Sequence, residues 1–270
     1  ESLAGAAGGT SVVIGGQGTG KSRLALEVAA GASRGCAWFL NASTNETLRE
    51  SLARAEHRER FGPSDDQLDK EQIDEFATLA LERLADAQAG WLVVLDNVRF
   101  VPSAAKWLPQ PNAARDQHLI ITTTEEVWAD TPDVRVVRLD RLPQVDLPEW
   151  LEAEPALVDV TDGRPLMVDA LSRFRAAAGH EVLAKRTSEV LARRGDAGQP
   201  VDGPAVFCDV VLKTLDDGAA EDVAGFAAWL PPDRIELDLL RQLSDAGDAA
   251  LDLAAHGLFQ AQRSAAGDPV

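Results

Sequence analysis

Eight residues near the start of the chain have the types and spacing that bind phosphate. Residues 15–22 read GGQGTGKS and fit the pattern G-x-x-x-x-G-K-[ST]. Glycines allow backbone N–H groups to turn inward and form a concave site for anions. In such a loop the lysine, here Lys21, reaches the β- and γ-phosphates, and the hydroxyl of Ser22 coordinates Mg²⁺. These residues predict a phosphate-binding loop, or P-loop, that holds a nucleotide with Mg²⁺.

The segments on both sides of the loop support this interpretation. Residues 11–15 (SVVIG) are an apolar run typical of a buried strand, and residues 22–30 (SRLALEVAA) have helical spacing. A strand, a glycine-rich loop and a helix in this order distinguish a P-loop from an ordinary glycine-rich turn. Arg23 is expected either to contact a phosphate or the ribose, or to lie in solvent. The expected nucleotide contacts of this region come from Gly15, Gly16, Gln17, Gly18, Thr19, Gly20, Lys21, Ser22 and Arg23.

Asp96 directly follows another apolar run, residues 91–95 (WLVVL), which predicts a buried strand. An acid at this point is the Walker B pattern, which holds Mg²⁺ through water; the alternative is an aspartate that only ends a strand. Asn97 takes the position where many ATPases have a second acid, and an amide is a poor general base. We therefore expect slow hydrolysis. Lys21, Asp96 and Asn97 are the expected catalytic residues, and Ser22 and Asp96 are the expected Mg²⁺ ligands.

A third apolar run, residues 118–123 (HLIITT), ends in hydroxyl side chains. Thr122 and Thr123, with Thr124 after them, are placed where a strand edge could contact the γ-phosphate. The alternative is that they are ordinary β-branched strand residues, which threonine favours.

The remaining pattern of the first 141 residues alternates strands with helices. Residues 36–42 and 134–139 predict two further strands. A capping box at Ser43–Glu46 predicts a helix through residue 57, and apolar spacing over residues 68–84 predicts a long amphipathic helix. Strands that alternate with helices predict an α/β fold: a parallel P-loop NTPase sheet covered on both faces.

After Arg141 the pattern contains helices only. They are expected at residues 147–153, 165–179 and 180–194, before a linker at residues 193–204 that is rich in Gly, Pro and Asp. Several short helices and a terminal hairpin are expected after the linker. We therefore predict three parts, which are a nucleotide-binding domain (1–141), a small helical domain (142–198) and a winged-helix domain (199–270).

Composition limits the classes of function. The chain of 270 residues can bury a sizeable core, and it has no apolar run long enough to cross a membrane. Its formal net charge of −18 argues against duplex DNA as a main partner. Two separated cysteines, Cys36 and Cys208, suit a reducing cytoplasm. Because the chain begins at Glu1 without a methionine, we expect it to be a fragment excised from a longer protein.

The ordered set of motifs resembles the NB-ARC ATPases of the STAND class of P-loop NTPases, and is closest to bacterial regulators that join this module to TPR repeats. The set is GGQGTGKS, WFLNAS, WLVVLDNV, HLIITTTEEVW and DGRPLMVDAL, within residues 15–171, and the resemblance as a whole spans nearly the whole chain. Within it, GRPL at residues 163–166 matches the family's GLPL motif. The resemblance implies that Pro165 packs on the adenine; from the sequence alone Pro165 is a helix-starting proline. Thr124 stands where the family often has a sensor arginine.

The resemblance also implies a mechanism. The three parts close around ADP in an inactive state, and exchange to ATP opens them and allows homo-oligomerisation. Flanking effector and sensor domains would complete the signalling protein. The alternatives are a scaffold that keeps ADP without hydrolysing ATP, a mechanical AAA+-like ATPase, and a small-molecule kinase. Asn97 and the acidic charge argue against the mechanical ATPase, and the helical half shows no arginine cluster of the kind a kinase lid needs.

Overall fold

The computed structural model describes residues 9–31, 36–62, 68–101, 105–143, 146–196, 198, 202–215, 220–221, 224 and 246–255. The chain divides into two compact units, Glu1–Asp140 and Arg141–Val270.

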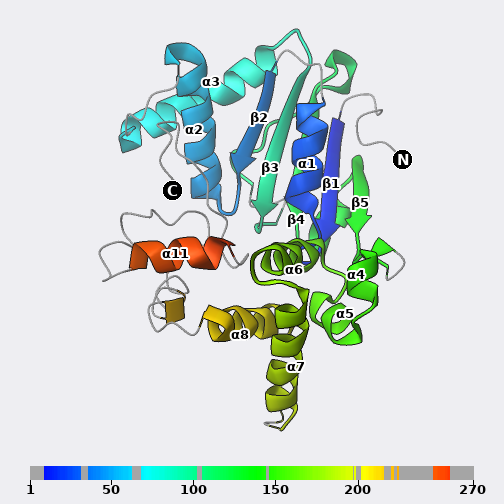
Figure 1. The fold of residues 1–270 in the computed structure, drawn as a ribbon. Helices are drawn as coiled ribbons and strands as arrows, with labels where there is room; N and C mark the ends of the chain where they lie inside the picture. Colours follow the sequence, from blue (N-terminus) through cyan, green and yellow to red (C-terminus); the bar gives the residue numbers. More distant parts are fainter. Residues whose placement is uncertain are drawn as a thin grey trace. The chain divides into compact units, whose positions relative to one another are not determined.

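The first unit contains a five-stranded parallel sheet (Figure 1). Its strands are β1 (Gly9–Gly15), β2 (Cys36–Asn41), β3 (Trp91–Val98), β4 (His118–Thr123) and β5 (Val134–Leu139). The spatial order is β2-β3-β4-β1-β5, with every pair parallel. The predicted parallel α/β sheet is confirmed. Strand β4 lies between β1 and β3, so the strand that ends in threonines separates the P-loop strand from the strand that carries Asp96.

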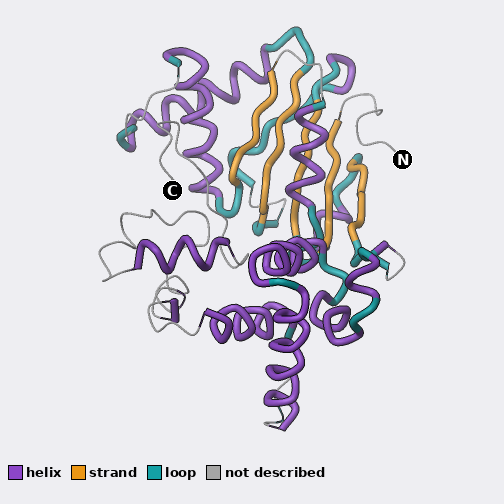
Figure 2. Tube along the Cα trace, in the orientation of Figure 1, coloured by secondary structure: helices purple, strands orange, loops and turns teal. Residues whose placement is uncertain are grey.

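Helices cover both faces of this sheet (Figure 2). Alternate residues of β1 enter different cores: Val13 packs with α1 (Lys21–Ala30), and Val12 packs with the core formed by α2 (Asn45–Phe61) and α3 (Lys70–Asp86). Because strand side chains alternate between faces, α1 covers one face, and α2 and α3 cover the other. This arrangement explains why the strands read as continuous apolar runs.

The start of α2 differs from the prediction. The cap is Thr44 rather than Ser43, and its partner is Thr47 rather than Glu46. The Thr44 hydroxyl accepts a hydrogen bond from the Thr47 backbone N–H at 3.1 Å, and the Thr47 hydroxyl accepts one from the Thr44 N–H at 2.9 Å. The N–H of Ser43 is bonded to the side chain of Asn41, which keeps Ser43 in the turn after β2.

A buried carboxylate joins α2 to α3. Glu56 is fully buried, and its carboxylate lies 2.6 Å from Nε of Arg60 and 2.7 Å from Nε of Arg83. We expect Glu56→Ala to lower the free energy of unfolding by about 2 kcal/mol, because two arginines lose a charged partner and a buried site empties. Urea unfolding would measure the change. Glu59→Ala, on the exposed side of α2, is the control; equal losses in both variants would contradict this role.

The second unit is helical. A single apolar core contains buried side chains from every helix of this unit that the structure describes. These helices are α4 (Glu149–Glu152), α5 (Pro155–Thr161), α6 (Pro165–Ala178), α7 (His180–Asp196), α8 (Gly203–Leu215) and α11 (Ala246–Ala255). Helix α5 had no counterpart in the prediction, since its seven residues (PALVDVT) are too few and too β-branched to show a helical period.

The predicted linker at residues 193–204 is partly helical, because α7 continues to Asp196 and α8 begins at Gly203. A Cβ atom at Gly203 would lie only 2.0 Å from the carbonyl oxygen of Val160, so α8 approaches α5 closely at a position that requires glycine. The terminal hairpin of the predicted winged helix falls outside the described residues. The division into three domains, at 141 and 198, stays a prediction. Among the helices that the structure describes, none has the length and apolar character to cross a membrane.

Candidate functional site

Backbone geometry gives the predicted P-loop a shape that only glycine allows at several positions. Strand β1 ends at Gly15, and α1 begins after Gly20, which has a φ of 92°. Gly18 also has a positive φ, of 76°. A Cβ atom on Gly15 would lie 2.4 Å from the carbonyl oxygen of Leu139, so β5 approaches the loop too closely for a side chain. Gly20 offers no side-chain cap, which leaves the first N–H groups of α1 for a ligand.

The lysine of the motif folds back over the loop. Lys21 Nζ donates hydrogen bonds to the carbonyl oxygens of Gly15 at 2.9 Å and Gly16 at 2.7 Å. Partial burial lowers the pKa of Lys21 below its ordinary value, and the negative charge of Asp96 opposes this shift. The Thr19 hydroxyl donates to Gly16 O at 3.0 Å and braces the same end of the loop. The ammonium group therefore lies at the Gly15–Gly16 end.

Two hydroxyls from different elements donate to one oxygen of Asp96. Ser22 Oγ, in the first turn of α1, lies 2.7 Å from Asp96 Oδ1, and Thr122 Oγ1, near the end of β4, lies 2.6 Å from the same atom. The strand order explains this meeting, because β4 places Thr122 beside the end of β3 while α1 begins after β1. The structure thus brings together the two residues predicted to hold Mg²⁺, Ser22 and Asp96.

Asn97 has an unusual backbone conformation. Its φ is 64°, and the pairing of β3 with β4 shifts between Leu95 and Val98. The Asn97 N–H donates to Thr122 Oγ1 at 2.9 Å. Strand β3 was predicted to end in Asp96-Asn97, but it continues through this irregularity to Val98. The catalytic role of Asn97 stays a prediction.

The structure gives the predicted phosphate-sensing threonines partners within the protein. Thr122 is fully buried and bonded as described above. Thr123 is 1% exposed, and its hydroxyl donates to Val98 O at 2.6 Å and accepts from the Glu125 N–H at 2.9 Å. Thr124 is exposed. A phosphate contact by Thr122 or Thr123 stays a prediction, and the observed hydrogen bonds hold the end of β4 against β3.

Three other predicted residues have different surroundings. Gln17 is exposed on the loop. Arg23 is 75% exposed and pairs with Glu27 one turn along α1, as expected if it lies in solvent. Pro165 occupies the first turn of α6 in the second unit, which is the helix-starting position. The adenine contact of Pro165 stays a prediction.

A small hollow opens beside the P-loop within the first unit. Its volume is about 180 Å³, and it lies at the carboxyl ends of β1, β4 and β5, where open α/β sheets bind ligands. The lining residues are Ile14, Gly15, Gly16, Thr124, Glu126, Arg138, Leu139 and Asp140. Sequence analysis did not assign Glu126, Arg138 or Asp140 to the site, because only the strand order shows that the end of β5 adjoins the loop.

No group of three or more His, Cys, Asp or Glu side chains in the described part of the chain could hold a metal by itself. A Mg²⁺ ion at Ser22 and Asp96 would therefore take its other ligands from water and phosphate oxygens, as Mg²⁺ commonly does.

Comparisons with known proteins identify the fold of the chain. No protein-family model and no curated protein matches the sequence. Among solved structures, a STAND protein with a tetratricopeptide repeat sensor from Pyrococcus horikoshii is 17% identical, with a TM-score of 0.54. The match covers 97% of this chain but only 38% of that one. The chain therefore has a P-loop NTPase-like α/β fold and spans less than half the length of this neighbour.

Two further solved structures match this chain less well. The Drosophila origin recognition complex, solved bound to DNA, is 14% identical with a TM-score of 0.36, over 84% of this chain and 64% of that one. Cdc6p from Pyrobaculum aerophilum is 12% identical with a TM-score of 0.35, over 95% of this chain and 82% of that one.

Proposed function

We propose that the chain is the ATP/ADP-binding switch of a STAND signalling protein. It holds ADP in a closed state, exchanges ADP for ATP with Mg²⁺, and then oligomerises in the cytoplasm through a longer protein that carries effector and TPR-type sensor domains. The observation that carries the proposal is that the hydroxyls of Ser22 and Thr122 both donate to Asp96. They do so beside the P-loop, where Lys21 Nζ donates to the carbonyl oxygens at the start of the loop. In this proposal residues 199–270 form the winged helix and Pro165 packs on the adenine.

The residues present fit a nucleotide with Mg²⁺. The uncapped start of α1 and the glycine loop offer N–H donors to phosphates, and Lys21 adds a positive charge. Ser22 Oγ can give a lone pair to Mg²⁺ while its O–H donates a hydrogen bond to Asp96 Oδ1, 2.7 Å away, and Asp96 can hold a water molecule of the ion. When bound, Mg²⁺ would neutralise charge between the β- and γ-phosphates.

Slow hydrolysis follows from the residue next to Asp96. Asn97 has no carboxylate to take a proton from the attacking water, and its side-chain oxygen lies 3.4 Å from Nε of Arg99. A switch needs long-lived nucleotide states rather than rapid turnover. The γ-phosphate can shift the equilibrium between two forms only by its differential affinity for them. The same observation favours the second candidate, a scaffold that retains ADP without hydrolysing ATP.

The nucleotide content of the purified chain tests the proposal. The protein is denatured as purified, and the released nucleotide is identified and counted by HPLC; the expected result is ADP at close to one per chain. The chain is then emptied and titrated with ADP and ATPγS in Mg²⁺. A chain that contains no nucleotide and binds neither ligand would refute the switch. Bound ADP without measurable ATP turnover would support the scaffold instead.

A further inference from the structure

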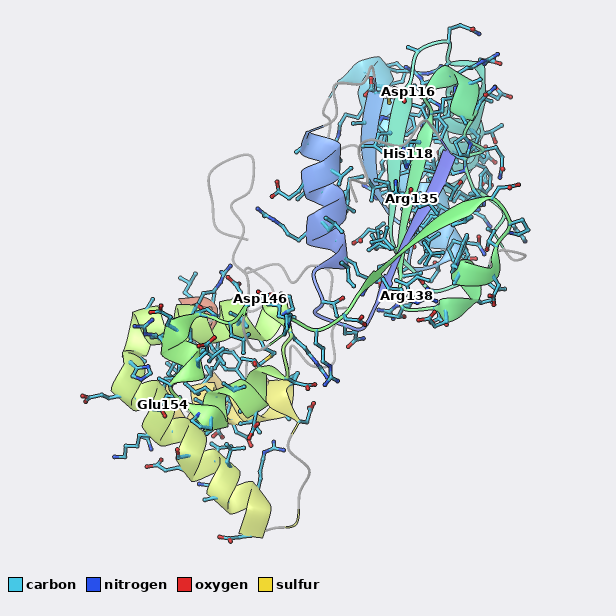
Figure 3. All side chains as sticks on the ribbon, turned by 90° about the vertical axis from the view of Figure 1, so that its right-hand side faces the viewer. Asp116, His118, Arg135, Arg138, Asp146 and Glu154 are labelled. Atoms are coloured by element: carbon cyan, nitrogen blue, oxygen red, sulfur yellow. The ribbon has the colours of Figure 1, made fainter. Side chains whose placement is uncertain are left out.

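The hollow beside the P-loop holds one arginine whose partner is a surface carboxylate. Arg138, near the end of β5, lies 2.8 Å from Glu126 in the short helix η4 (Glu126–Asp130). Their side chains are 56% and 67% exposed. Figure 3 shows Arg138 at the end of the sheet opposite His118. Among the described residues that line this hollow, which include Asp140, Arg138 is the one with a positive charge. Exposed ion pairs contribute little stability, so Arg138 can exchange its partner at small cost.

The hollow adjoins the end of the loop where the terminal phosphate would lie. The lysine of a P-loop reaches the β- and γ-phosphates, and Lys21 Nζ is bonded to the carbonyl oxygens of Gly15 and Gly16. The same two glycines line the hollow. Arg138 is paired with Ile14 across β1 and β5, one residue before Gly15. Arg138 and these two glycines line the same hollow, so the arginine lies beside the start of the loop.

We propose that Arg138 is the residue that recognises the terminal phosphate of ATP, and that Glu126 competes with this phosphate for the arginine. The inference rests on the proposed nucleotide switch and names the group that would distinguish its two states. A guanidinium can bond two phosphate oxygens at once, which makes a stronger pair than the single contact observed with Glu126. ADP has no γ-phosphate and leaves the Arg138–Glu126 pair intact.

If Arg138 exchanges Glu126 for the terminal phosphate, the structure around Glu126 changes. Glu126 begins η4, which lies between β4 and β5 in the chain. When the γ-phosphate of ATP pairs with Arg138, Glu126 loses its ion-pair partner and lies near the negative charge of the phosphate. The start of η4 is then driven away from the hollow by like-charge repulsion. Order and disorder of a segment near the γ-phosphate is a common switching device.

Titration calorimetry of the chain with Mg²⁺–ADP and Mg²⁺–ATPγS tests the inference. Arg138→Gln is expected to weaken ATPγS binding about tenfold and to change ADP binding less than twofold, because only the γ-phosphate contact is lost. Glu126→Gln is expected to tighten ATPγS binding, since the competing carboxylate and its repulsion are removed. Arg186→Gln is the matched control, because Arg186 also pairs with an exposed carboxylate, Glu189, at 2.9 Å.

The results separate this inference from the proposed function. Equal losses of ADP and ATPγS affinity in Arg138→Gln, or no loss of either, would overturn the role of Arg138 while leaving the nucleotide site in place. Failure of the unaltered chain to bind either nucleotide would overturn both. A γ-phosphate-specific loss in Arg138→Gln with a gain in Glu126→Gln would establish the exchange.

Discussion

Lys21→Ala is expected to lower the affinity for both ADP and ATPγS by about 100-fold, the largest effect of any substitution in the site. Lys21 Nζ donates two hydrogen bonds to loop carbonyl groups and is the positive charge of the loop itself. Two charge-assisted hydrogen bonds to phosphate, at about 1.5 kcal/mol each, account for the expected loss. Calorimetry or displacement of a fluorescent nucleotide would measure it.

The control is Lys185→Ala, which removes the same charge from an exposed position on α7. If both lysine variants bind nucleotide as tightly as the unaltered chain, the loop does not hold the phosphates. Unfolding curves of Lys21→Ala should change little, since the Lys21 side chain is only partly buried.

Nucleotide affinity should also respond to pH through Lys21. Burial lowers the pKa of this lysine, so its charge is lost at a lower pH than that of an ordinary lysine. Only the protonated form attracts phosphate. We therefore expect affinity for ADP to fall as the pH rises toward the ordinary lysine pKa, and this fall to disappear in Lys21→Ala. An alkaline profile unchanged by the substitution would contradict this origin.

The local parts of the site could be predicted from the sequence because their signals are contiguous. Residues 15–22 contain every group of the loop, and an acid after the apolar run 91–95 identifies Asp96 without any knowledge of its neighbours. The parallel sheet also follows from local patterns, since apolar strands that alternate with helices have few other arrangements.

The relations between elements could not be predicted in this way. Nothing local places β4 between β1 and β3, and that order decides that Thr122 meets Asp96. The same applies to Arg138. The segment that contains it, VRVVRL, predicts a strand, but its position near Gly15 depends on the pairing of β5 with β1. The left-handed backbone conformation of Asn97 also depends on a tertiary contact, because its N–H donates a hydrogen bond to Thr122 of another strand.

The buried hydroxyl of Thr122 is therefore the part of the site whose function can be tested only with the structure in hand. It donates to Asp96 Oδ1 at 2.6 Å and accepts from the Asn97 N–H at 2.9 Å. One side chain thus fixes both the carboxylate that would hold Mg²⁺ and the amide beside it. We regard Thr122 as a positioning residue, because it acts through Asp96 and Asn97.

Thr122→Val keeps a β-branched side chain of similar size and removes both hydrogen bonds. Without them the Asp96 carboxylate can rotate, so the gain in ATPγS affinity that Mg²⁺ provides is expected to fall about tenfold, while affinity in EDTA stays the same. The free energy of unfolding should also drop by about 1–3 kcal/mol, because the Asn97 N–H loses its partner. Binding with and without Mg²⁺, together with urea unfolding, measures the two effects.

Two further variants separate positioning from stability. Thr122→Ser retains the hydroxyl and should restore most of the Mg²⁺ effect. Ser11→Ala removes another buried hydroxyl of the same sheet, bonded to His118 at 3.0 Å, and should cost stability without changing the Mg²⁺ effect. If Thr122→Val behaves like Ser11→Ala, the hydroxyl only supports the fold. If only Thr122→Val loses the response to Mg²⁺, then β4 contributes to metal binding through a residue that never touches the ion.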